Sequence, residues 1–176
     1  NNKIYLKKKK FLKQIKTLNV DVKKSIDLAY KRIFQFHSKQ KVKNIFYKDK
    51  LKNKLSYKYL PIESVGIYVP GGTAAYPSTV LMNAIPAIIA GVKRIVMVNP
   101  LKNGKQNAGV LYAAKKCGIK EIYSIGGGQS IATLAYGTKK IKKVNKIVGP
   151  GNIFVATAKK EIYGDVGIDM IAGPSE

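Results

Sequence analysis

The sequence is poor in the side chains from which most catalytic centres are assembled. Its 176 residues include a single cysteine, a single histidine and only 9 carboxylates. The lone Cys117 excludes a disulfide framework and fits a reducing compartment, so we expect a cytoplasmic location. Because His37 has no partner histidine, the sequence excludes a Ser/His/Asp triad, an H-E-x-x-H motif and a clustered zinc site. We therefore predict no catalytic residue and no metal ligand among these residues.

Long apolar runs are also missing. The most apolar stretch, residues 77–91, is shorter than the roughly 18 residues that a membrane span needs, and it contains Pro86. Near the N-terminus, Lys13 and Lys16 interrupt the region where a signal peptide would be apolar. We therefore predict neither a membrane span nor a signal peptide, although the 45% hydrophobic content is enough for a packed core.

Arginine is scarce as well, since only Arg32 and Arg94 stand among the 33 basic residues. The formal net charge of +24 favours binding to phosphates, but arginine is the side chain best suited to bidentate phosphate and base contacts. The lysines are spread along the chain, as is typical of an AT-rich genome. We interpret them as solvent-exposed faces and predict no nucleic-acid partner. A basic α/β protein that binds a nucleotide or RNA without catalysis stays open as the alternative.

Residues 1–60 are predicted to form a helical and extended segment that belongs to a neighbouring domain. Apolar residues at helical spacing indicate two helices, interrupted at residues 19–21, with Asp21 as N-cap of a second helix over 22–38. His37 ends this helix, where a positive charge interacts well with the helix carbonyls. Residues 50–62 alternate apolar and polar side chains, which favours an exposed strand or extended arm.

Residues 61–176 alternate strand and helix patterns and predict an α/β fold, an incomplete Rossmann-like parallel sheet with flanking helices. Strands are predicted at 65–69, 94–98, 121–125, 146–148 and from 166 onward, and helices at 77–91, 107–116, 129–137 and 153–162. Pro77 suits the first position of its helix. Cys117 follows the last turn of another helix, which favours a packed thiol over a nucleophile.

Glycine-rich turns follow three of these strands, at residues 70–72, 126–128 and 149–151. In a parallel sheet the three turns open on one edge, so we expect a shared ligand cleft there. Each turn alone can serve backbone geometry only. Gln129 and Asn152 each start a helix after such a turn, where an amide can cap the helix or bind a ligand. Tyr68 ends its strand at the same edge, as a ligand contact or as a core aromatic that needs a hydroxyl partner.

Four motifs, in this order, resemble the histidinol dehydrogenase family. They are Gly66-Ile67-Tyr68-Val69-Pro70-Gly71-Gly72-Thr73-Ala74, Pro77-Ser78-Thr79-Val80-Leu81-Met82, Gly149-Pro150-Gly151-Asn152 and the closing Ile168-Asp169-Met170-Ile171-Ala172-Gly173-Pro174-Ser175-Glu176. The last matches the opening of the family signature I-D-x-x-A-G-P-S-E. The resemblance is dense from about residue 61 onward and looser in the lysine-rich front.

The resemblance implies an enzyme that oxidises L-histidinol through an aldehyde to L-histidine, the last step of histidine biosynthesis, as a homodimer that uses NAD and zinc. It places NAD contacts on Tyr68, Gln129 and Asn152, and a substrate contact on Ser175. The family's Glu-His acid/base pair and its zinc ligands follow the point where this sequence stops. We therefore expect a truncated piece that is inactive alone.

Overall fold

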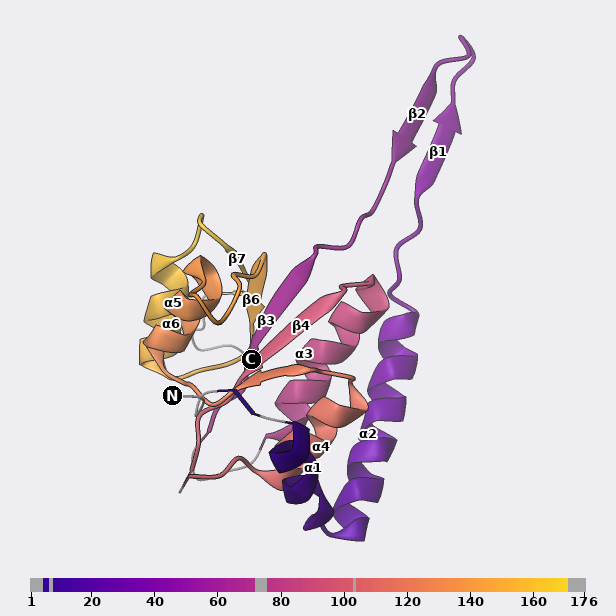
Figure 1. The fold of residues 1–176 in the computed structure, drawn as a ribbon. Helices are drawn as coiled ribbons and strands as arrows, with labels where there is room; N and C mark the ends of the chain where they lie inside the picture. The colour runs from indigo at the N-terminus through magenta and orange to yellow at the C-terminus, as the bar shows by residue number, and fades with distance from the viewer. Residues whose placement is uncertain (1–4, 7, 72–75, 103, 171–176) are drawn as a thin grey trace.

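The computed structural model describes residues 5–6, 8–71, 76–102 and 104–170. Within them the order of elements is α1 (Lys8–Lys16), α2 (Val20–Ser38), β1 (Ile45–Lys48), β2 (Lys54–Tyr57), β3 (Ser64–Tyr68), α3 (Pro77–Ala90), β4 (Arg94–Val98), α4 (Ala108–Lys116), β5 (Glu121–Tyr123), α5 (Gly128–Tyr136), β6 (Lys146–Val148), α6 (Ile153–Glu161) and β7 (Gly167–Ile168), as Figure 1 shows.

The described part of the chain contains a parallel five-stranded sheet in the order β5-β4-β3-β6-β7. The chain starts at the central strand β3, adds β4 and β5 on one side, and then crosses to add β6 and β7 on the other. Gly66 of β3 pairs with Val96 of β4 and with Ile147 of β6. The strand order therefore reverses between β3 and β6, as in a Rossmann-like sheet, and the predicted fold class is confirmed.

Helices cover both faces of this sheet (Figure 1). Ile67 and Val69 pack with α3 and α4 in one core, whereas the intervening Tyr68 packs with α5 and α6 in the other. This alternation follows from the strand geometry, which points successive side chains to opposite faces. Because both faces are covered, every residue of β3 is buried, as is usual for central parallel strands.

The N-terminal helices pack on the outside of α3 and α4. Ile15 of α1 and Ile26 of α2 belong to the same core as Leu111 of α4. The start of α2 differs from the prediction, because Asn19 rather than Asp21 is its N-cap and accepts a hydrogen bond from the Asp21 amide. The prediction of Asp21 was wrong because asparagine and aspartate cap helices about equally well, so residue type alone does not distinguish the two positions. The division into domains at residue 60 stays a prediction.

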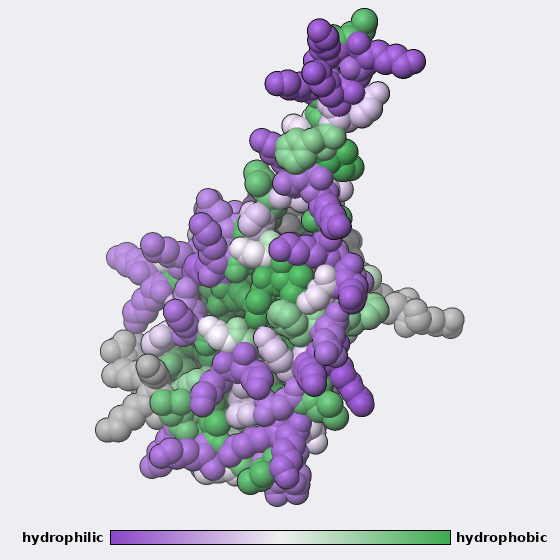
Figure 2. Space-filling model, turned by 90° about the vertical axis from the view of Figure 1, so that its right-hand side faces the viewer, coloured by the Kyte–Doolittle hydropathy of each residue, from purple (hydrophilic) through white to green (hydrophobic). Residues whose placement is uncertain are grey.

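The segment between α2 and β3 forms an arm, defined here as residues 42–60, which extends from the body of the molecule (Figure 1). The prediction of one exposed strand was incomplete, because β1 and β2 pair as an antiparallel hairpin. Asp49 closes the turn by accepting hydrogen bonds from the backbone and the side chain of Asn53. In Figure 2 hydrophilic side chains gather at the tip of the arm, and apolar ones lie nearer the body.

Most predicted element boundaries agree with the structure to within two residues. The strand Arg94–Val98 and the helix start at Pro77 are confirmed, and Gly91 ends α3 with a φ of 88°. Left-handed backbone at this position favours glycine. None of the helices in the described residues is long and apolar enough to span a membrane.

Candidate functional site at the carboxyl ends of the strands

The turns that follow β3, β4 and β5 are packed against one another. A Cβ atom at Gly71 would lie 2.6 Å from Cγ of Pro100, and a Cβ atom at Gly126 would lie 2.6 Å from Cβ of the same proline. Asn99, which is buried, donates from Nδ2 to the carbonyl of Val69 at 3.0 Å. Glycine is therefore required in two of these turns so that neighbouring loops can approach closely.

Tyr68 lies where these turns meet the central strand. Its side chain is only 5% exposed, and its hydroxyl oxygen accepts a hydrogen bond from the Gly127 amide at 3.3 Å. The interpretation as a core aromatic with a hydroxyl partner is thus confirmed. The same bond ties the end of β3 to the turn before α5, so Tyr68 also shapes the edge at which a ligand is expected.

Gln129 is exposed and lies in the first turn of α5. Its side chain folds back over the preceding turn, because its Oε1 would lie 2.7 Å from a Cβ atom at Gly127. The N-cap of α5, Gly127, has no side-chain capping bond. Backbone N–H groups at such a helix start favour an anionic ligand, so Gln129 and the start of α5 form one polar surface.

Asn152 is exposed and is the N-cap of α6, where its Oδ1 accepts a hydrogen bond from the Val155 amide at 3.2 Å. The capping interpretation is confirmed, and the capping bond does not use the NH₂ group of this amide. The starts of α5 and α6 are close together, since a Cβ atom at Gly128 would lie 3.5 Å from the Phe154 carbonyl oxygen. The segments that carry Tyr68, Gln129 and Asn152 therefore meet at one edge. Ser175 lies outside the described residues.

Sequence reasoning missed a buried ion pair behind the Gly149 turn. Lys159 of α6 is 4% exposed, and its Nζ lies 2.6 Å from Oδ1 of Asp169. This lysine corrects the interpretation of the lysines as solvent-exposed faces. A signal was present, because residues 155, 159 and 162 follow the spacing of a buried helix face.

Cys117 and His37 are the single cysteine and the single histidine of the chain, and the contacts of both side chains indicate structural roles. Cys117 is buried at the end of α4, and burial raises the pKa of its thiol to about 12. It is therefore protonated at neutral pH and unsuited to nucleophilic attack. Nδ1 of His37 lies 2.6 Å from Oε1 of Gln40 near the end of α2. Among the described residues no cluster of three or more His, Cys, Asp or Glu side chains could hold a metal ion.

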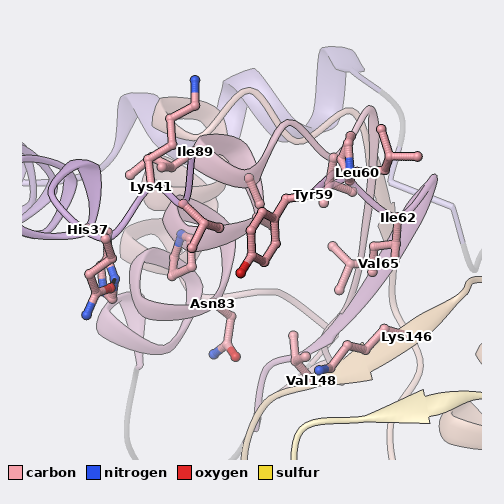
Figure 3. Close-up of a pocket in the computed structure, with 17 residues that line it drawn as sticks. His37, Lys41, Tyr59, Leu60, Ile62, Val65, Asn83, Ile89, Lys146 and Val148 are labelled. Atoms are coloured by element: carbon pink, nitrogen blue, oxygen red, sulfur yellow. Dashed lines mark hydrogen bonds between the residues drawn. The ribbon is translucent and has the colours of Figure 1, made fainter. Parts of the chain in front are cut away.

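A cavity of about 570 Å³ lies between the base of the arm, α3 and the sheet. Figure 3 shows Tyr59 of the arm with Asn83 of α3 and Val148 of β6 below it. The described residues that line this cavity are mostly apolar and include none from the glycine-rich turns. The cavity is therefore separate from the strand-end site.

Comparisons with known proteins agree with this architecture. A histidinol dehydrogenase from Pelagibacter ubique is 72% identical over 169 residues, which cover 96% of this chain. One from Acinetobacter baylyi is 54% identical over 167 residues, which cover 93% of this chain. The crystal structure of histidinol dehydrogenase from Elizabethkingia anophelis matches 98% of this chain, with a TM-score of 0.93 and 38% identity. The chain spans about 40% of the length of these relatives. Because the family model for Histidinol dehydrogenase matches residues 1–176, the chain belongs to the histidinol dehydrogenase family.

Proposed function

We propose that this chain forms the NAD-binding side of an enzyme that oxidises L-histidinol through the aldehyde to L-histidine. The observation that carries the proposal is that Tyr68 and Gln129 both lie against Gly127, at the carboxyl edge of the sheet. The chain that places them there belongs to the histidinol dehydrogenase family. Ligands of open α/β sheets bind at this edge. NAD⁺ would supply the hydride acceptor when bound.

The residues at the edge fit a dinucleotide. The uncapped start of α5 offers backbone N–H groups to a pyrophosphate, and the side chain of Gln129 lies over the same turn. The NH₂ group of Asn152 can donate to a ribose or a phosphate while its oxygen caps α6. Tyr68 is buried beneath and orients the turn through its hydroxyl.

Zinc does not fit the described residues, which contain no group of suitable ligands. We propose that the zinc ligands, together with the acid/base pair, belong to a longer polypeptide. Ser175 is proposed to contact the substrate. The single buried thiol of Cys117 supports a reducing, cytoplasmic location.

We also propose that the complete protein is a homodimer. The arm exposes large apolar side chains on both of its strands, among them Phe46 at 70% and Tyr57 at 59%. A hairpin whose two strands are exposed throughout is marginally stable by itself, and a second subunit could cover this surface. Replacement of Phe46 by lysine should shift the mass measured by light scattering from dimer to monomer.

The central test uses a chimera in which residues 1–176 replace the matching segment of the Pelagibacter ubique enzyme. We expect NADH formation from L-histidinol by the chimera and none by the 176-residue chain. Gln129→Ala should raise the KM for NAD⁺ in the chimera about tenfold, whereas Gln35→Ala, at an exposed glutamine of α2, should not change it. A folded chimera without turnover would contradict the proposal. A salt-dependent affinity for RNA without NAD binding would favour the alternative.

A further inference from the structure

Lys159 is unusual among the basic residues because its side chain is buried. It is 4% exposed and shares a helix face with Val155 and Ile162, which are buried in the core between the sheet and α5. Lysine is almost never fully buried unless its ammonium group is paired. The hydrogen-bond partners of the ammonium group therefore indicate the role of this buried lysine.

The ammonium group of Lys159 donates to two acceptors. One belongs to Gly149, and the other is a carboxylate that itself binds Gly149. The ammonium group donates to the carbonyl oxygen of Gly149 and to Oδ1 of Asp169, 2.6 Å away. The other carboxylate oxygen, Oδ2 of Asp169, accepts a hydrogen bond from the Gly149 amide at 2.8 Å. The ion pair thus binds both the N–H and the C=O group of Gly149.

Gly149 has a backbone conformation and a packing that favour glycine at this position. Its φ is +111°, and a Cβ atom there would lie 2.2 Å from the carbonyl oxygen of Tyr68. It is the first residue after β6, at the point where the strand order reverses, and it begins the turn that ends at Asn152. A shift at Gly149 would therefore move the helix start of α6 relative to Tyr68.

We infer that Lys159 and Asp169 are positioning residues for the cofactor. They hold the turn 149–152 against the end of β3, so that Asn152 keeps its place beside the turn of Gly127. The inference rests on the proposed function. Both residues act through the backbone of Gly149, and a small misplacement of a binding group is enough to lower its effect strongly.

The test compares neighbouring lysines in the active chimera. Lys159→Met removes the buried ammonium group, whereas Lys160→Met makes the same change at an exposed position of the same helix. We expect Lys159→Met to raise the KM for NAD⁺ about tenfold and to leave the KM for L-histidinol within about twofold. Lys160→Met should change neither. The assays should run well below the thermal midpoint of each variant, so that only folded protein is compared.

A merely structural role would lower the thermal midpoint without moving the KM for NAD⁺, and that result would overturn the inference. If Lys159→Met does not fold, the variant Asp169→Asn tests the inference instead. Its amide oxygen can still accept a hydrogen bond from the Gly149 amide, but the ion pair with Lys159 is lost. We expect about a threefold rise in the KM for NAD⁺ from Asp169→Asn, and an unchanged KM would overturn the inference. If the unsubstituted chimera folds but neither binds nor reduces NAD⁺, the proposed function itself fails.

Discussion

The parallel sheet and the arm both contain strands rich in apolar and aromatic residues, but in opposite surroundings. Strand β3 reads Ser-Val-Gly-Ile-Tyr and is buried throughout, whereas β1 reads Ile-Phe-Tyr-Lys and is exposed throughout. The difference lies in their neighbours, because β3 pairs on both sides and is covered on both faces, and β1 pairs only with β2. Apolar, β-type residues therefore specify a strand, but the neighbouring elements decide whether it contributes to a core.

The largest effect is expected at Gly149, in the turn that follows β6 of the sheet. We expect Gly149→Ala to lower the free energy of unfolding by about 3–5 kcal/mol, because a left-handed backbone and a clash with Tyr68 add up. Gly164→Ala is the matched control, since its φ is +107° and nothing lies within 4 Å of the new methyl group. Its cost should be only about 1–2 kcal/mol. Urea unfolding measures both, and equal effects would show that the packing at Gly149 is looser than described.

Isoleucines in the sheet and in the arm should differ in their contribution to stability. Ile67 in β3 is fully buried, whereas Ile45 in β1 is 58% exposed. We expect Ile67→Ala to cost about 3 kcal/mol through lost burial and a cavity, and Ile45→Ala to cost less than about 0.5 kcal/mol in the isolated chain. Urea unfolding again measures the difference. A larger cost at Ile45 would mean that the arm is packed in solution.

Acid should affect an ion pair of the sheet more than the turn of the arm. Arg94 donates to both carboxylate oxygens of Glu121 at 2.8 Å and holds the pKa of Glu121 below its ordinary value. The pair therefore stabilises the fold above the ordinary carboxyl pKa, and this contribution is lost as the pH falls through the lowered pKa. Glu121→Gln should cost about 1–2 kcal/mol at pH 7 and progressively less in acid.

The control for this ion pair is Asp49 in the turn of the arm. Hydrogen bonds from Asn53 lower the pKa of Asp49 in the same direction, but this carboxylate lies in the turn of the arm and outside both hydrophobic cores. Asp49→Asn should therefore leave the pH dependence of global unfolding unchanged. Thermal unfolding between about pH 2 and pH 7 compares the two variants, and an identical pH dependence for Glu121→Gln and the unsubstituted chain would contradict the expectation.

The smallest effect is expected within the arm itself. Lys52 has a φ of 68°, a left-handed conformation that a residue with a Cβ atom adopts at a cost. Lys52→Gly removes this cost, but glycine also loses more conformational freedom on folding. The net stabilisation of the turn should be about 0.5 kcal/mol. Amide exchange of β1 and β2 should slow, while that of β3 stays the same. Faster exchange in the arm would show that Lys52 makes a favourable contact there.

Much of the fold was predictable because its signals are local. The βαβ order, the start of α3 at Pro77 and its end at Gly91 follow from periodicity, from the fixed φ of proline and from the freedom of glycine. The N-cap at Asn19 was missed because Asp21 has equal capping propensity. The hairpin was missed because pairing between β1 and β2 depends on a turn without a glycine, closed by Asp49.

The amino-acid sequence alone predicted an α/β protein with glycine-rich turns after its strands, and its motifs indicated the family. The folded structure was needed to show that Tyr68 is buried and hydrogen-bonded to Gly127, and that Lys159 pairs with Asp169 behind Gly149. Hydrophobic periodicity and turn chemistry act over a few residues, so the sequence reveals them directly. A buried ammonium group depends on acceptors that the fold brings together from other elements.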